Sequence, residues 1–440
     1  MKNHPHHSIP FVCLLTLLLA VTLQSFTRWV PLKPLKGYTE PLEPVECNLS
    51  TCLDGSYQAF LTDLAQRNTG FRECLIRNYN QVVYTCFNSV TNHNIVKGYD
   101  NELFLTMYLD EVTGKSVEEV FQNVKQAEKD IHWKVTKTLR LIDTLKQHDK
   151  EFLFVFAPTK TAVYPEKMPK HYQRQVADFN LEEYYIELFE EQGIPYIDFY
   201  HYFQAIKDTV SYPLYATTGS HWAQATIPWV ADSILRKMAS LTGYQLPGIQ
   251  LIDPNPTTQY SDYDSELEGN MNLLFPLRKP AIPNPVFTLR DTAGASRPNL
   301  LVVADSYFDQ LMFSCFPKAF NRCDFWQYNR TVYSSDGYYK EPIQNVYDAP
   351  VTLQEADMVL ALFTAPMMYD FMYDFHGRVN QTINLPDKEV MKMMRAIRST
   401  PKWYEAVVKQ AEERGITVEE NLRRNALYYL ENSKNNKTQE

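Results

Sequence analysis

The sequence has no excess of positive charge, because 43 lysines and arginines stand against 52 aspartates and glutamates, for a formal net charge of −9 at pH 7. It also has no basic stripe and no RNA-binding signature, so nucleic acid is not an expected partner. Hydrophobic residues make up 45% of the 440 positions and charged residues 22%, which is typical of a globular chain with one large core or two modest ones.

Cysteine is scarce and shows no metal-binding pattern. None of the seven cysteines stands in a C-x-x-C pair or at short spacing from a histidine, so we predict no metal and no cofactor. Cys13 lies in an apolar run, and the other six are an even number, which permits disulfides in an exported domain. The simplest pairing joins sequence neighbours, although the connectivity stays open: Cys47 with Cys52, Cys74 with Cys86, and Cys315 with Cys323.

Only one long apolar run is present, from Ile9 to Phe26. At about 1.5 Å per residue it barely spans a bilayer. No small-x-small cleavage site follows it, so an uncleaved membrane anchor is favoured over a cleaved signal peptide, with the remaining chain outside the cytoplasm, periplasmic or at the cell surface. We therefore assign a signal anchor to residues 1–30 and a Pro-rich linker to residues 31–46.

The rest of the chain alternates between strand-like and helix-like patterns. Continuous apolar runs predict buried strands at 152–158, 195–199, 299–304 and 357–363. Helical spacing predicts one long helix opened by a capping box at Ser116 and Glu119, and further helices at 180–192 and 222–242. This alternation predicts an α/β, three-layer domain with a mainly parallel sheet over 118–385, between a helical and strand extension at 47–117 and C-terminal helices at 386–440.

The strand predicted at 299–304 leads directly into Asp305 and Ser306. A hydroxyl at a strand-to-helix turn lies at the carboxyl edge of the sheet, where open α/β sheets bind ligands. Ser306 is therefore a candidate nucleophile, with a helix N-cap as the structural alternative. The base that such a serine needs is best supplied by His221, whose alternative is a cap or core contact beside Trp222.

Other side chains near predicted strand ends are candidates for supporting roles. Lys160 and Tyr164 follow the strand at 152–158, and Lys160 is a candidate for neutralising an anionic sugar or an oxyanion. Asp198 either orients a histidine or caps the following turn. Asp305 either holds its turn or presents a carboxylate to the site. The position two before the histidine, where an orienting aspartate would be expected, is Gly219.

Three short motifs follow one another along the chain. They are Ala157-Pro158-Thr159-Lys160 with Val163-Tyr164-Pro165-Glu166, then Gly219-Ser220-His221-Trp222, then Val303-Ala304-Asp305-Ser306-Tyr307. Together they resemble the SGNH-hydrolase-like domain of the AlgJ/AlgX alginate O-acetyltransferase group, also called DHHW-type proteins. The histidine motif precedes the serine motif, as in that family, and the resemblance covers about 120–364. The family has Asp-x-His-Trp where this chain has Gly219 at the first position.

The resemblance implies an O-acetyltransferase that acts on an exported or cell-surface polysaccharide. Ser306 would take the acetyl group and His221 would be its general base. A membrane-bound O-acyltransferase would supply the acetyl groups, and the apolar run would anchor the protein beside it. Two alternatives stay open: an esterase that deacetylates polysaccharide, and a catalytically inactive scaffold or glycan-binding protein, which the glycine at position 219 motivates.

Overall fold

The computed structural model describes residues 8–37, 40–253, 256–335, 340–343, 346, 349–383 and 387–435. The chain divides into two compact units. The smaller unit comprises Met1–Lys97 and Ser265–Lys279, and the larger comprises Gly98–Asp264 and Pro280–Glu440. The larger unit thus begins about twenty residues before the predicted domain start at 118.

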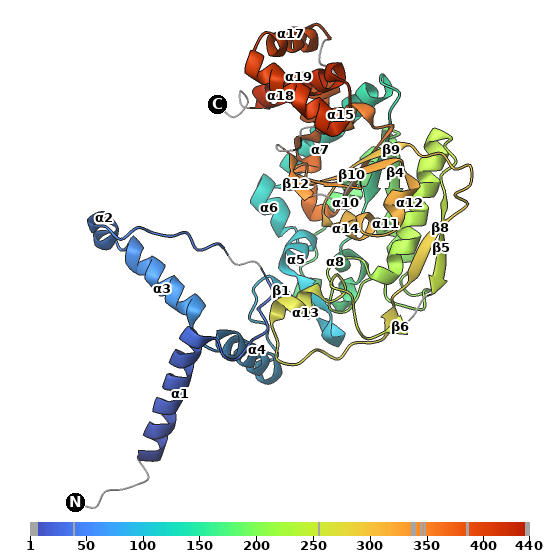
Figure 1. Cartoon of the computed structure of the whole chain (residues 1–440). Helices are drawn as coiled ribbons and strands as arrows, with labels where there is room; N and C mark the ends of the chain where they lie inside the picture. Colours follow the sequence, from blue (N-terminus) through green and yellow to red (C-terminus); the bar gives the residue numbers. More distant parts are fainter. Residues whose placement is uncertain are drawn as a thin grey trace, which may run out of the picture. The chain divides into compact units, whose positions relative to one another are not determined.

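A seven-stranded sheet forms the centre of the larger unit (Figure 1). In spatial order its strands are β12 (Lys340–Pro342), β11 (Thr331–Ser334), β10 (Arg322–Gln327), β9 (Asn299–Ala304), β13 (Met358–Phe363), β3 (Glu151–Phe156) and β4 (Tyr196–Asp198). The five strands from β10 to β4 are parallel, and β11 and β12 are antiparallel. The predicted mainly parallel sheet is confirmed, and the carboxyl ends of its five parallel strands lie at one edge.

Helices cover both faces of this sheet, because alternate residues of each strand point to opposite sides. Phe154 belongs to one buried cluster and its neighbour Leu153 to the other. The first cluster includes side chains of α7 (Val124–Lys146) and α10 (Leu181–Glu191), and the second includes side chains of α11 (Phe199–Ile206) and α12 (Ile227–Thr242). The predicted three-layer α/β arrangement is therefore confirmed.

Two predictions about individual elements are wrong. The long helix expected from Ser116 is two helices, α6 (Lys115–Phe121) and α7. The first ends at its C-cap, Gln122, which has a φ of +66°. The side chain of Asn123 then caps α7 by accepting from the backbone N–H of Gln126 at 3.1 Å. Ser116 lies inside α6, whose N-cap is Gly114, so no capping box forms there. The strands β10, β11 and β12 were not predicted, since the β10 sequence contains Arg, Asp and Gln and the other two are short.

The remaining elements of the larger unit are short. They are β2 (Leu103–Leu105), α5 (Thr106–Val112), α8 (Lys160–Val163), α9 (Lys170–Gln173), α14 (Asp309–Met312), α15 (Ala349–Glu355) and α16 (Phe375–Ile383). Two small antiparallel pairs also occur, β5 (Gly248–Asp253) with β8 (Val286–Arg290) and β6 (Pro256–Thr257) with β7 (Ile282–Pro283).

The C-terminal part of the larger unit is helical, as predicted (Figure 1). It consists of α17 (Asp387–Arg398), α18 (Pro401–Arg414) and α19 (Val418–Asn435). These helices have a small core of their own with α15, in which Ile397, Val407 and Leu422 are buried against Val351.

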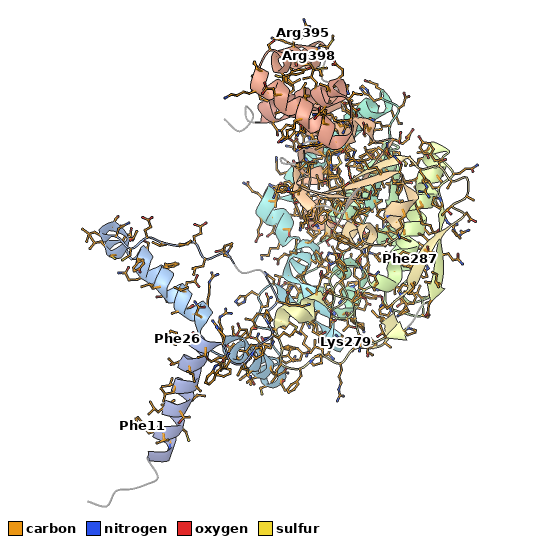
Figure 2. The ribbon with its side chains drawn as sticks, viewed as in Figure 1. Phe11, Phe26, Lys279, Phe287, Arg395 and Arg398 are labelled. Atoms are coloured by element: carbon orange, nitrogen blue, oxygen red, sulfur yellow. The ribbon has the colours of Figure 1, made fainter. Side chains whose placement is uncertain are left out.

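The smaller unit contains α1 (Ser8–Thr27), α2 (Leu49–Leu53), α3 (Ser56–Asn68), α4 (Arg72–Phe87), β1 (Ile95–Lys97) and α13 (Glu266–Met271). Within the described residues, only the segment Pro10–Thr27 of α1 is long and apolar enough to cross a membrane, with a mean hydropathy of 1.8. Its apolar side chains are exposed, 65% for Phe11 and 84% for Phe26 (Figure 2). These properties fit an anchor, and a signal sequence near an N-terminus shares them.

None of the cysteine pairs that the sequence permits is joined by a disulfide in the structure. All seven cysteines lie in described residues, and each is a free thiol. Cys74 and Cys86 both lie in α4, where twelve residues of helix separate them by roughly 18 Å, well beyond the reach of a disulfide. Cys47 and Cys52 lie near each other, with 4.0 Å between their Sγ atoms.

A partly buried carboxyl group makes the stability of the larger unit sensitive to pH. Burial raises the pKa of Glu111 to about 7, although the hydroxyl of Tyr369, which donates to Glu111 Oε2 at 2.6 Å, lowers it. The folded state therefore binds more protons than the unfolded state between about pH 4.5 and 7. We expect this group's contribution to stability to be complete below that window and to be lost as the pH rises through it.

Glu111→Gln removes the ionisable group and keeps an oxygen that can accept from Tyr369. We expect the variant to match the wild type at pH 4 and to be more stable at pH 8 by up to about 3 kcal/mol. Urea unfolding at pH 4, 6 and 8 measures this difference, with the exposed Glu119→Gln as the control. The same pH dependence in the wild type and in Glu111→Gln would contradict the prediction.

Candidate functional site

Ser306 and His221 lie side by side although 85 residues separate them in the sequence. The distance between His221 Nε2 and Ser306 Oγ is 2.9 Å, which is a hydrogen bond. Ser306 is partly exposed and His221 is buried. A base that is shielded from water and a hydroxyl that a substrate can reach is the arrangement that nucleophilic catalysis needs.

Ser306 is fixed by the turn that follows β9. It opens a short 3₁₀ helix, Ser306–Phe308, for which Asp305 is the N-cap. Asp305 Oδ1 accepts from the backbone N–H of Tyr307 at 2.9 Å, and Oδ2 accepts from the N–H and the hydroxyl of Thr364 at 2.7 and 2.8 Å. Burial raises the pKa of Asp305, against these hydrogen bonds and the nearby His221, which lower it. Asp305 therefore ties the turn after β9 to the turn after β13.

His221 lies in a loop that closes on itself. The backbone N–H of Ala223 donates to the carbonyl of Leu214 at 2.7 Å, and Tyr215 and Trp222 form an antiparallel bridge. Trp222 is fully buried, and its ring packs on Tyr307 at 5.1 Å between centroids.

The serine and histidine motifs also contact each other directly. The hydroxyl of Tyr307 donates to the carbonyl of Ser220 at 2.8 Å, and the rings of Tyr307 and His221 lie 4.8 Å apart. Movement of either motif would therefore disturb the other, which keeps the distance between Ser306 and His221 short.

Lys160, the candidate for neutralising an anionic sugar or an oxyanion, lies in the protein interior. Its side chain is fully buried, and its ammonium group pairs with Glu102 at 2.7 Å. The Nζ atom also lies within hydrogen-bond distance of four carbonyl oxygens: Leu103 at 3.0 Å, Ala216 at 2.7 Å, Thr217 at 2.9 Å and Gly219 at 3.2 Å. Three of these carbonyls belong to the loop that carries His221, so Lys160 holds that loop in place.

Tyr164 and Asp198 also have local partners. The hydroxyl of Tyr164 accepts from the backbone N–H of Leu214 at 2.9 Å, and burial raises the pKa of Tyr164 to about 12. Asp198 caps α11 by accepting from the N–H of His201 at 2.9 Å and pairs with His201 Nδ1 at 2.6 Å. Since β4 is three strands away from β9, roughly 14 Å, Asp198 orients His201 and is not brought to Ser306.

Sequence reasoning missed Tyr328, which follows β10 at the same edge of the sheet. Burial and then the charge of Asp305 raise the pKa of Tyr328, whereas hydrogen bonds from the side chain and the backbone of Ser306 lower it. The backbone N–H of Tyr328 donates to the carbonyl of Ala304 at 2.9 Å, which places Tyr328 beside the turn that carries Ser306. Only the adjacency of β9 and β10 could have revealed this residue, because β10 was not recognised in the sequence.

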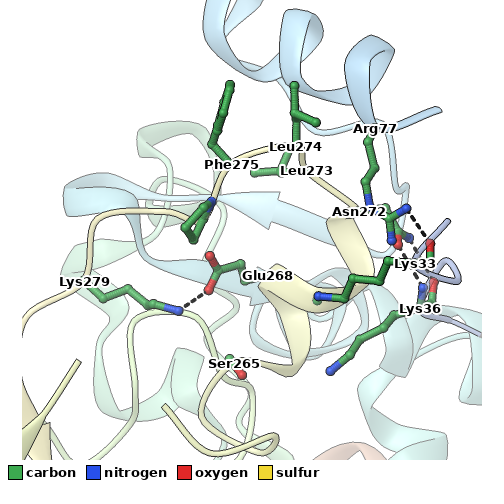
Figure 3. A pocket seen from close by; sticks show the side chains of 12 residues that line it. Lys33, Lys36, Arg77, Ser265, Glu268, Asn272, Leu273, Leu274, Phe275 and Lys279 are labelled. Carbon is green, nitrogen blue, oxygen red and sulfur yellow. Dashed lines mark hydrogen bonds and ion pairs between the residues drawn. The ribbon is translucent and has the colours of Figure 1, made fainter. Parts of the chain in front are cut away.

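The described residues contain no group of three or more His, Cys, Asp and Glu side chains that could hold a metal ion. A separate pocket of about 370 Å³ lies in the smaller unit (Figure 3). Its lining includes Lys279, which pairs with Glu268, and Arg77, which donates to the carbonyls of Lys33 and Pro34 at 2.8 and 2.9 Å. No histidine lines this pocket, so it does not repeat the chemistry of Ser306 and His221.

Comparisons with known proteins agree with the sequence motifs. Residues 116–301 match the family model described as SGNH hydrolase-like domain, acetyltransferase AlgX. The match includes Lys160 and His221 and ends five residues before Ser306. No curated protein matches the chain by sequence.

Similar solved structures have low sequence identity to this chain. The O-acetyltransferase domain of Pseudomonas putida AlgJ is 14% identical, with a TM-score of 0.42, over 64% of this chain and 99% of that one. Pseudomonas aeruginosa AlgX is 14% identical, with a TM-score of 0.41, over 64% and 67% of the two chains. Bacillus cereus PatB1 is 12% identical, with a TM-score of 0.35, over 56% and 93%. The resemblance to the AlgJ/AlgX group is confirmed, and the chain has an SGNH-like α/β fold whose residues 116–301 match the AlgX acetyltransferase family.

Proposed function

We propose that this protein is an O-acetyltransferase that modifies an exported or cell-surface polysaccharide through an acetyl-Ser306 intermediate. The observation that carries the proposal is the 2.9 Å contact between Ser306 Oγ and His221 Nε2 in a domain that resembles acetyltransferase AlgX. The partly exposed hydroxyl and the buried imidazole favour a catalytic site over an inactive scaffold, because a scaffold would not require this pairing.

The reaction would proceed in two steps. In the first, Ser306 Oγ attacks the carbonyl carbon of an acetyl donor while its proton moves to His221 Nε2, and His221 then protonates the leaving group as the bond between it and the acetyl carbon breaks. In the second, the oxygen of a sugar hydroxyl attacks the acetyl carbon and its proton moves to His221. The bond between that carbon and Ser306 Oγ then breaks, and His221 returns the proton to Oγ. A membrane-bound O-acyltransferase would supply the acetyl donor, and α1 would hold the protein beside it outside the cytoplasm.

Mass spectrometry after brief exposure to p-nitrophenyl acetate tests the intermediate. We expect one added acetyl group on the peptide that contains Ser306 and none in His221→Ala. Product analysis with bare and acetylated oligosaccharides, including alginate oligosaccharides, then identifies the acceptor. Acetyl transfer to a bare sugar supports a transferase, and release of acetate from acetylated sugar alone would replace it by an esterase. Glycan binding in the complete absence of both reactions would favour the scaffold.

The Tyr328 hydroxyl is a candidate for stabilising the acyl oxygen in the transition state, because Tyr328 adjoins the turn that carries Ser306. We expect Tyr328→Phe to lower kcat for p-nitrophenyl acetate by about 10- to 100-fold and to leave KM within about twofold, since the hydroxyl would bind the charge that develops during reaction. Tyr333→Phe is the matched control, because the hydroxyl of Tyr333 contacts Gln327 at 3.3 Å instead. Equal kcat values for the two variants would contradict the prediction.

A further inference from the structure

The space around Gly219 is occupied by another segment of the chain. A Cβ atom at this position would lie 2.7 Å from the carbonyl oxygen of Tyr263 and 3.1 Å from the Cα of Asp264. The first distance is shorter than real contacts allow, and both neighbours are backbone atoms. The aspartate that the family pattern has two residues before the histidine therefore cannot fit here, because the backbone of Tyr263 and Asp264 fills its place.

That segment brings a buried carboxylate to the histidine loop. Asp264 is 2% exposed. Its carbonyl accepts from the hydroxyl of Thr218 at 2.9 Å, and its Oδ1 accepts from the backbone N–H of Gln224 at 3.0 Å. Thr218 and Gln224 each lie three residues from His221, one before it and one after it. The preceding residue of the segment, Tyr263, packs edge to face on the His221 ring at 6.0 Å between centroids.

We propose that Asp264 is the positioning residue that orients His221, in place of the aspartate that is absent at position 219. This inference rests on the proposed function for its catalytic meaning and on the geometry for its placement. His221 Nε2 is engaged by Ser306, so its Nδ1 is the atom that an orienting acid must bind.

Asp264 has the capacity for this bond. An ionised carboxylate offers about four acceptor positions. The N–H of Gln224 uses one, and the hydroxyl of Ser261, 2.9 Å from Oδ2, uses another. A carboxylate this buried also needs a compensating partner, and an imidazole that becomes charged during the reaction is such a partner.

The other polar groups that face His221 are less suitable. Asp305 acts on His221 through its charge, but its two carboxylate oxygens hold Tyr307 and Thr364 in the adjoining turns. The Ser220 hydroxyl lies 3.5 Å from Nδ1, at the limit of a hydrogen bond, and carries no charge. The rings of Tyr263 and Tyr307 pack on the imidazole, and Lys160 contacts the carbonyl of Gly219 rather than the ring.

The first test measures His221 directly and does not depend on activity. Nitrogen-15 NMR of histidine-labelled full-length protein, assigned with His221→Gln, reports the tautomer and the pKa of the ring. We expect the neutral ring of the wild type to carry its proton on Nδ1, and Asp264→Asn to lower the pKa of His221 because a negative neighbour is removed. The matched control is Asp262→Asn, an exposed carboxylate in the same segment, which should leave the pKa unchanged. A proton on Nε2, or equal pKa values in Asp264→Asn and the wild type, would overturn the proposal.

The second test uses hydrolysis of p-nitrophenyl acetate. We expect Asp264→Asn to lower kcat by about 10²- to 10⁴-fold with KM within about threefold, and the acidic limb of its pH–rate profile to move to lower pH. Asp264→Glu should recover part of the lost kcat. The control variant Asp262→Asn should keep the wild-type kcat. A merely structural role would reduce the folded fraction without moving the acidic limb.

The two proposals fail in different ways. An inactive wild type whose His221 carries the Nδ1 proton and responds to Asp264→Asn would refute the transferase and retain Asp264 as the orienting acid. An active wild type matched by an equally active Asp264→Asn would refute the role of Asp264 and leave the acetyl-serine chemistry intact.

Discussion

Replacing Ser306 by alanine is expected to lower the turnover of p-nitrophenyl acetate by at least about a thousandfold. The hydroxyl is the only group of that side chain that can bind the acetyl group, and residual catalysis would come from binding and from nearby donors alone. Steady-state kinetics of the purified wild type and of Ser306→Ala measure the effect. The fold of the variant should be unchanged, because the turn is held by Asp305 rather than by the serine hydroxyl.

The matched control for this prediction is Ser314→Ala, which removes a hydroxyl that donates to the carbonyl of Leu311 at 2.7 Å in a nearby turn. It should retain the wild-type rate. His221→Ala should be about as slow as Ser306→Ala, and the double variant little slower than either, since the two groups act as a unit. Equal turnover in Ser306→Ala and the wild type would end the nucleophile hypothesis.

Replacing Lys160 by methionine is expected to lower the free energy of unfolding by about 3 to 5 kcal/mol. The variant would keep most of the buried volume and remove the charge that pairs with Glu102, so a carboxylate and four carbonyl oxygens would lose their shared donor. Three of those carbonyls belong to the loop that contains His221. Turnover should therefore also fall in the fraction of the variant that stays folded. Chemical unfolding monitored by circular dichroism measures the change in stability.

Lys115→Met provides the comparison for Lys160→Met. Lys115 pairs with Asp110 at 3.2 Å, but its side chain is 55% exposed, so losing that pair should cost at most about 1 kcal/mol. If both variants were equally stable, Lys160 would not hold the loop as its contacts imply. A stable Lys160→Met with lost turnover would instead assign the residue to the chemistry.

The sequence was informative where a local pattern reports a local structure. Continuous apolar runs located β3, β9 and β13, and the C-terminal helices α17, α18 and α19 lie within the predicted range 386–440. Asn180 caps α10 by accepting from the backbone N–H groups of Glu182 and Glu183, at the predicted start of that helix. Prediction from the sequence failed where the backbone conformation of a single residue interrupts a helical pattern, as at Gln122 between α6 and α7. Prediction from the sequence also failed at β10, because its Arg, Asp and Gln residues interrupt the apolar pattern of a strand that the fold nevertheless buries.

The candidate site divides in the same way. Ser306 and His221 were predictable because a serine after a buried strand and a histidine before a helix belong to recognisable motifs. The role of Lys160 was not, because a charged residue near a strand end can face a substrate, a loop or its own helix, and only the fold decides which. For Asp198 the structure shows the predicted alternative of a cap, at the start of α11. Tyr328 and Asp264 could not be predicted, since each belongs to a segment that carries no motif.

The sequence by itself determined the alternating strands and helices, the apolar segment near the N-terminus and the two residues that form the Ser306–His221 pair. Only the tertiary structure decided how that pair is supported. The buried Lys160 contacts the histidine loop, and the backbone of Tyr263 and Asp264 fills the space beside Gly219. The physical reason is that burial and hydrogen-bond partners arise from contacts between segments far apart in the chain, and local patterns contain no record of those contacts.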